Sequence, residues 1–156
     1  GAAVRARFEA EWAATAPGLA VQVTDGRARE ALAAADVVLV ASGTATLETL
    51  LSKRPMVVAY RLAGLTAFLL RRLGLVKVKH FSQPNLLVGR AVVPELFQEA
   101  ATPQALGAAL LAWLDDPARV AAAQTAFAEV HERLRCGGAG LAAEAVLEVL
   151  APRAGS

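Results

Sequence analysis

The chain has 156 residues, a length typical of a single domain with a substantial core. Hydrophobic residues make up 56% of it and aromatic residues only 5%, so the core must consist mainly of Ala, Leu and Val. A net charge of +2 is too small to indicate a nucleic-acid partner from bulk charge. The single cysteine, Cys136, excludes an internal disulfide, and the wide spacing of His80 and His131 predicts no metal site. The composition therefore suits a reducing compartment and a site without metal or cofactor.

Two helices and two strands are predicted before the first motif. Helical spacing predicts a helix over residues 2–14, and alternating apolar and polar residues predict a strand over 19–24. Residues 27–35 read as a short helix that leads into a Val-rich strand over 37–40. That strand does not alternate, as is typical of one buried on both faces of a parallel sheet. Because doubly wound domains normally open on a buried strand, the opening helix predicts a fragment that lacks its N-terminal part.

A turn of small residues follows the strand that ends at Val40. It contains Ser42, Gly43 and Thr44, at the position where open α/β sheets bind ligands, and the free N–H groups at the start of the next helix suit a phosphate. Glu48 lies one helical turn beyond Thr44 on the same face, where its carboxylate can accept hydrogen bonds from a sugar diol. The alternative is that Ser42 or Thr44 only caps the helix and Glu48 only complements its dipole.

The rest of the chain is predicted to hold one more strand and a series of helices. Thr102 and Asp116 each precede a proline, the pattern of an N-cap followed by proline at the first helical position. Trp113 and Phe127 fall on Ala- and Leu-rich helical faces, which favours core packing. Strands that alternate with helices predict an α/β fold, a Rossmann-like parallel sheet with helices on both faces and a helical C-terminal tail. The elements expected are a strand over 56–60, helices over 46–52, 65–73, 104–114, 118–135 and 141–150, and mostly loop over 77–90.

A basic, amphipathic pattern surrounds the helix expected over 65–73. Arg61, Arg71 and Arg72 flank its apolar residues, a pattern typical of helices that lie on anionic membrane surfaces. We expect Arg61, Phe68, Arg71 and Arg72 to face a membrane. The alternative is that the apolar side of this helix simply packs on the sheet.

Five motifs together resemble the C-terminal half of the lipid-A-disaccharide synthases. They are ASGTATLE (41–48), KRPMVVAYR (53–61), SQPNLLVGR (82–90), VPELFQE (93–99) and RLRCGG (133–138). They occur in the order and spacing of that family, which has the B-type glycosyltransferase fold of two Rossmann-like domains. The resemblance implies that residues 1–150 are a partial donor-binding domain with C-terminal helices, that 151–156 are a tail, and that the N-terminal domain with the acceptor site and catalytic base is missing.

The resemblance also implies a reaction, a place in the cell and a set of donor-binding residues. The family transfers 2,3-diacylglucosamine from its UDP derivative to 2,3-diacylglucosamine 1-phosphate, which gives a β-1,6 disaccharide and UDP. The transfer is inverting and metal-independent, and we expect this fragment alone to be inactive. The implied setting is the cytoplasmic face of the inner membrane of a Gram-negative bacterium, with a homodimer as one form of assembly. The implied contacts with the UDP-sugar are Ser42, Gly43, Thr44, Glu48, Asn85, Arg90 and Gln98.

Two alternatives stay open beside this interpretation. One is another UDP-sugar enzyme of the same fold, such as the peptidoglycan N-acetylglucosaminyltransferase or a UDP-sugar epimerase. RLRCGG and PNLLVGR argue against it. The other is a non-catalytic nucleotide-binding or protein-interaction module, which for a dinucleotide would need a G-x-G-x-x-G run that the sequence does not contain.

Overall fold

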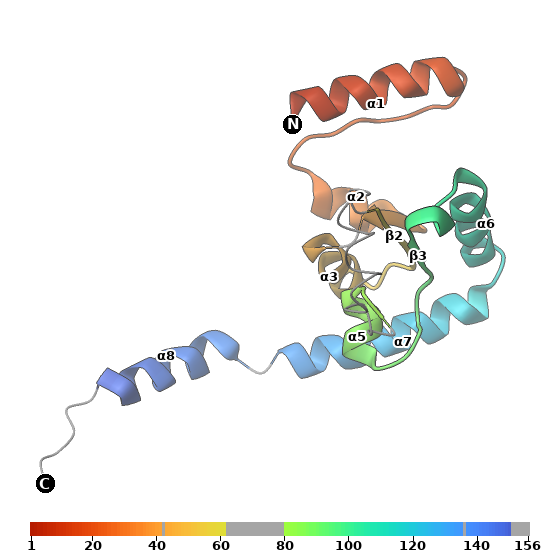
Figure 1. Ribbon diagram of the computed structural model, residues 1–156. Helices are drawn as coiled ribbons and strands as arrows, with labels where there is room; N and C mark the ends of the chain where they lie inside the picture. Colours follow the sequence, from red (N-terminus) through yellow and green to blue (C-terminus); the bar gives the residue numbers. More distant parts are fainter. Residues whose placement is uncertain (42, 62–79, 136, 151–156) are drawn as a thin grey trace, which may run out of the picture.

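The computed structural model describes residues 1–41, 43–61, 80–135 and 137–150. Their centre is a sheet of three parallel strands in the order β1-β2-β3, with β1 at Val38–Ala41, β2 at Met56–Tyr60 and β3 at Glu95–Phe97 (Figure 1). Ala41 is level with Ala59, which in turn is level with Leu96, so all three carboxyl ends lie at one edge. The predicted α/β fold with a parallel sheet is confirmed.

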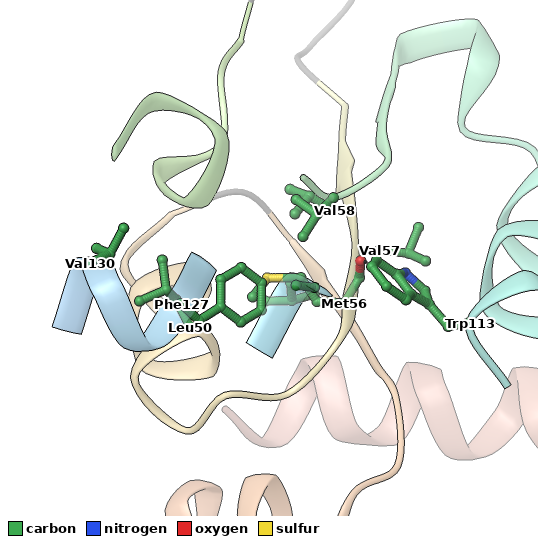
Figure 2. Packing of buried hydrophobic residues seen from close by; sticks show 10 residues of the cluster. Leu50, Met56, Val57, Val58, Trp113, Phe127 and Val130 are labelled. Carbon is green, nitrogen blue, oxygen red and sulfur yellow. Dashed lines mark hydrogen bonds between the residues drawn. The ribbon is translucent and has the colours of Figure 1, made fainter. Parts of the chain in front are cut away.

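Helices cover both faces of this sheet. The helices α3 (Thr44–Leu51) and α7 (Pro117–Leu134) pack on one face, and α6 (Pro103–Leu114) packs on the other. Successive side chains of a strand point to opposite faces, and Figure 2 shows Val57 beside Trp113 on one side of β2 and Met56 beside Phe127 on the other. The Trp113 indole Nε1 donates to the Met56 carbonyl oxygen at 3.0 Å. The core positions predicted for Trp113 and Phe127 are confirmed.

Caps and prolines delimit the C-terminal helices as predicted. The Thr102 hydroxyl accepts a hydrogen bond from the Ala105 N–H at 3.2 Å, and the Asp116 carboxylate accepts one from the Arg119 N–H at 2.9 Å. The helix α8 (Gly138–Leu150) follows α7 and extends away from the sheet in Figure 1. None of the helices in the described ranges is long and apolar enough to cross a membrane.

The N-terminal part differs from the prediction in two places. The helices α1 (Ala2–Thr15) and α2 (Ala28–Ala34) form as expected, but residues 19–24 between them are not a strand. Alternating apolar and polar residues give a segment two different faces but do not provide a neighbouring strand, and no strand of the described sheet pairs with residues 19–24. The strand β1 is also less buried than predicted, because α6 lies mainly over β2 and leaves Leu39 49% exposed.

The segment predicted as mostly loop, residues 77–90, contains a helix. The helix α5 spans Gln83–Val88, with Ser82 as its N-cap residue and Gly89 as a left-handed C-cap at φ 79°. Its proline lies in the first turn, where proline favours a helix, so the prediction wrongly took it as a loop signal. The strand β3 and the 3₁₀ turn η1 (Gln98–Ala100) were not predicted as separate elements. The helix expected over 65–73 lies outside the described residues.

Candidate functional site

The turn after β1 leaves the start of α3 without a side-chain cap. Gly43 is the N-cap residue, and since it has no side chain the first N–H groups of the helix have no such partner. Thr44 is the first helical residue and is exposed, so the alternative in which Thr44 caps the helix is wrong. Ser42 lies outside the described residues. Exposed N–H groups at the positive end of a helix dipole are suited to bind an anion such as a phosphate.

Gly43 holds this turn in a conformation that other residues rarely adopt. Its φ is 144°, and a Cβ at this position would meet no atom within 4 Å, so the backbone angle rather than the space favours glycine. The Thr46 hydroxyl and N–H both donate to the Gly43 carbonyl oxygen, at 2.7 and 3.1 Å. Because Thr46 is fully buried, these bonds fix the turn to the core.

The Glu48 carboxylate is exposed on α3 and free to bind a ligand. Within the described part of the chain it makes no hydrogen bond or ion pair, and it is not in the first turn of the helix. Dipole effects fall off within the first turn, so the alternative in which Glu48 only complements the dipole has little physical support. Glu48 lines a largely apolar cavity of about 350 Å³ between α2, β1 and α3. That volume is near the lower limit of ordinary ligand pockets.

Gln98 follows β3 at the same edge of the sheet as the turn. It begins η1 with φ 53°, one of two positive φ values among the described residues other than glycine, and it is 7% exposed. Backbone strain of this kind is often found at functional sites. The ends of β1 and β3 are about 10 Å apart, since neighbouring strands are about 4.8 Å apart. A nucleoside diphosphate bound at Gly43 can therefore place an attached sugar near Gln98.

Asn85 is buried and uses its whole hydrogen-bonding capacity within the protein. Its Oδ1 accepts from the Val92 N–H at 2.7 Å and the Val93 N–H at 2.9 Å, and its Nδ2 donates to the Val93 carbonyl at 2.9 Å and to Glu95 Oε1 at 2.8 Å. An amide side chain has two donor hydrogens and one acceptor oxygen with two lone pairs, and all are used. The Asn85 side chain therefore connects α5 to the residues that lead into β3 and to the first residue of that strand.

Of the remaining predicted residues, Arg61 lies at this edge, Arg90 lies apart from it, and three lie outside the described ranges. Arg90 is exposed in the connection that leads into β3, whereas the turn after β1 and Gln98 follow carboxyl ends. Arg61 is exposed directly after β2, while Phe68, Arg71 and Arg72 lie outside the described residues. In those ranges no group of three or more His, Cys, Asp or Glu side chains could hold a metal ion.

Sequence reasoning missed one polar residue of this region, Glu95. It lies in the quoted motif VPELFQE, and its carboxylate accepts hydrogen bonds from Phe81, Ser82 and Asn85. The signal available in the sequence was an acidic residue followed by two apolar residues and preceded by Val-Val-Pro. A carboxylate in such a run needs buried partners.

Comparison with known proteins identifies the family. The sequence profile described as lipid-A-disaccharide synthetase matches residues 2–148. The chain is 59% identical to the lipid-A-disaccharide synthase of Alkalilimnicola ehrlichii over 128 residues, which are 82% of the chain and 33% of that protein. It is 55% identical to the Pseudomonas aeruginosa enzyme over 136 residues, 86% of the chain and 34% of the relative. For the Pectobacterium carotovorum enzyme the values are 48% identity, 96% of the chain and 38% of the relative. The chain thus spans about a third of the length of these relatives, and it belongs to the lipid-A-disaccharide synthase family.

Proposed function

We propose that this chain is the donor-binding part of a lipid-A-disaccharide synthase. The observation that carries the proposal is the uncapped start of α3 after β1, followed by the free carboxylate of Glu48, in a chain of this family. The donor is UDP-2,3-diacylglucosamine and the acceptor is 2,3-diacylglucosamine 1-phosphate. The products are the β-1,6-linked disaccharide and UDP.

In this reaction the acceptor hydroxyl forms a bond to the anomeric carbon while the bond from that carbon to UDP breaks. Negative charge then develops on the departing diphosphate. In this proposal the N–H groups of the turn at Ser42, Gly43 and Thr44 stabilise that charge without a metal ion. The hydrogen bonds from Thr46 to the Gly43 carbonyl oxygen support it, because they fix Gly43 before the reaction. Glu48 accepts hydrogen bonds from the ribose hydroxyls. The general base that takes the acceptor proton belongs to the part of the enzyme that this chain does not cover.

The other donor-side residues have distinct roles in this proposal. Gln98 contacts the donor sugar from the carboxyl end of β3, which its place at the same edge as the turn supports. Asn85 acts by positioning, since its side-chain amide is fully used inside the protein. Arg90 is exposed in the connection that precedes β3, and its assignment to the donor side rests on its place in the motif SQPNLLVGR.

A titration with UDP tests the assigned turn directly. Because the diphosphate binds at the start of α3, the amide NMR signals of Ser42, Gly43 and Thr44 should shift more than those of any other segment. The helices after Thr102 provide the internal comparison, since they contribute nothing to the assigned turn. The largest shifts in α6 or α7 instead would show that the site is assigned wrongly.

We also propose that the basic segment after β2 binds the anionic surface of the inner membrane. The chain should co-sediment with vesicles that contain anionic lipid and dissociate as salt rises, because each basic residue near such a surface contributes about 1 kcal/mol. Substituting alanine for Arg61, Arg71 and Arg72 should reduce binding, whereas the matched change at Arg5, Arg7 and Arg29 should not. Binding that is independent of lipid charge and of salt would contradict this proposal.

A further inference from the structure

The Glu95 carboxylate is the centre of a hydrogen-bond network that joins β3 to the start of α5. Its Oε2 accepts from the Phe81 N–H at 3.1 Å, and its Oε1 accepts from the Ser82 N–H at 2.9 Å, from the Ser82 hydroxyl and from Asn85 Nδ2 at 2.8 Å. All four of these donors are uncharged. Ser82 and Asn85 are buried, so water cannot easily replace Glu95 as their acceptor.

This network fixes an aromatic side chain at the carboxyl edge of the sheet. In the parallel register Tyr60 pairs with Phe97, and Glu95 lies two residues before Phe97 on the same face of β3. The Phe81 ring packs against both aromatic rings, with centroid distances of 5.5 Å to Phe97 and 6.1 Å to Tyr60. Because Glu95 accepts the Phe81 N–H, it fixes the backbone from which this ring projects.

The aromatic cluster of Tyr60, Phe81 and Phe97 lies next to Gln98. Phe97 directly precedes Gln98, whose backbone has a positive φ and whose side chain is mostly buried. Packing around such a residue must be well defined for the strained backbone to persist. A shift of the Phe81 ring would therefore change the position of Gln98 relative to the end of β3.

We propose that Glu95 is a positioning residue for the sugar end of the donor. Its carboxylate holds Phe81 and Ser82, the aromatic cluster holds the end of β3, and Gln98 is thereby presented to the sugar. This inference rests on the proposed donor site. It differs from a purely structural role in one respect. The turn proposed to bind the phosphate follows β1, which is two strand spacings or about 10 Å from β3, whereas the hydrogen-bond partners of Glu95 lie in residues 81–85.

The test compares two ligands on the complete 156-residue chain. Affinities for UDP and for UDP-2,3-diacylglucosamine are measured by calorimetry in the same detergent, for the unmodified chain and for Glu95→Gln. The variant keeps the size of the side chain but turns an NH₂ group toward an N–H donor, so one hydrogen bond is lost. We expect the affinity for the donor to fall roughly fivefold or more, because Gln98 would be displaced from the sugar. The affinity for UDP should change by less than about twofold, because UDP has no sugar at that end.

Two further variants make the test decisive. Glu144→Gln makes the same chemical change on the exposed helix α8 and should leave both affinities unchanged. Ser82→Ala removes one donor of the network while leaving both backbone donors, so we expect a smaller loss of donor affinity, about twofold to threefold. If Glu95→Gln does not fold, the Ser82→Ala variant decides.

The outcomes separate this inference from the function on which it rests. No binding of UDP by the unmodified chain would overturn the proposed donor site and this inference with it. Normal binding by the unmodified chain, together with an unchanged donor affinity in Glu95→Gln, would overturn the role of Glu95 alone. An equal loss of affinity for both ligands would show that Glu95 only stabilises the fold.

Discussion

Replacing Asn85 with aspartate should lower the free energy of unfolding by about 3 to 5 kcal/mol at neutral pH, the usual cost of an uncompensated buried charge. The shape of the side chain is preserved, and one oxygen can still accept from the Val92 and Val93 N–H groups. The second oxygen, however, replaces an NH₂ that donates to the Val93 carbonyl and to Glu95. Two donated hydrogen bonds thus become two repulsive contacts, one of them between carboxylates.

The destabilisation by Asn85→Asp should depend on pH in a defined direction. Burial and the neighbouring Glu95 would raise the pKa of the introduced carboxyl group in the folded state above its unfolded value of about 3.9. The unfolded chain therefore releases this proton first, and the cost of folding grows as pH rises above about 4. Urea denaturation at about pH 4 and pH 7 should show a small difference from the unmodified chain at the lower value and a large one at the higher value.

A matched variant distinguishes burial from charge alone. Gln104→Glu introduces a carboxylate on the exposed side of α6 and should change the unfolding free energy by less than about 0.5 kcal/mol at either pH. If Asn85→Asp were equally destabilising at both pH values, the loss would come from packing rather than from charge. The hydrogen bonds donated by Asn85 would then not make the predicted contribution to the free energy of unfolding.

Elements with local signals were predictable from the sequence, and those held by distant contacts were not. Thr102 and Asp116 with their following prolines marked the starts of α6 and α7 because caps act within one turn. The helix α5 has only six residues and was missed, since helices this short depend on tertiary contacts such as those of Asn85. The prediction of a strand over residues 19–24 was wrong for the opposite reason: the local alternation is present, but a strand also requires a neighbouring strand to pair with.

The candidate site shows the same division. The turn at Gly43 was predictable because a small-residue turn after an apolar strand is a local pattern, and its φ of 144° is one that favours glycine. Nothing in the sequence showed that Gln98 adopts a positive φ or that Glu95 receives its donors from residues 81–85. Those features arise when β3 and α5 come together. Sequence spacing places residues on elements, while the contacts between elements determine which of them can reach a ligand.

Glu48→Gln should weaken the binding of UDP by about tenfold or more. The carboxylate is free within the described residues, so in the proposed complex it accepts hydrogen bonds from both ribose hydroxyls. Glutamine keeps the shape but substitutes a neutral acceptor, and hydrogen bonds to charged groups contribute roughly 1.5 to 3 kcal/mol. Calorimetry with UDP measures the change. The melting temperature should be nearly unaffected, because Glu48 is exposed and lies beyond the first turn of α3.

Removing one ribose hydroxyl from the ligand identifies what Glu48 contacts. The unmodified chain should bind 2′-deoxy-UDP less tightly than UDP. Glu48→Gln should discriminate less between the two ligands, because it lacks the carboxylate that accepts the hydrogen bond from the 2′-hydroxyl. The difference between the two ratios isolates the pairwise interaction, as in a double-mutant cycle. Glu129→Gln on the exposed side of α7 makes the same change away from the turn and should preserve both the affinity and the discrimination. If a folded Glu48→Gln chain bound UDP as tightly as the unmodified chain, Glu48 would not be part of the donor site. A favourable interaction with the helix dipole would not explain this residue either, because a glutamate beyond the first turn contributes little to helix stability.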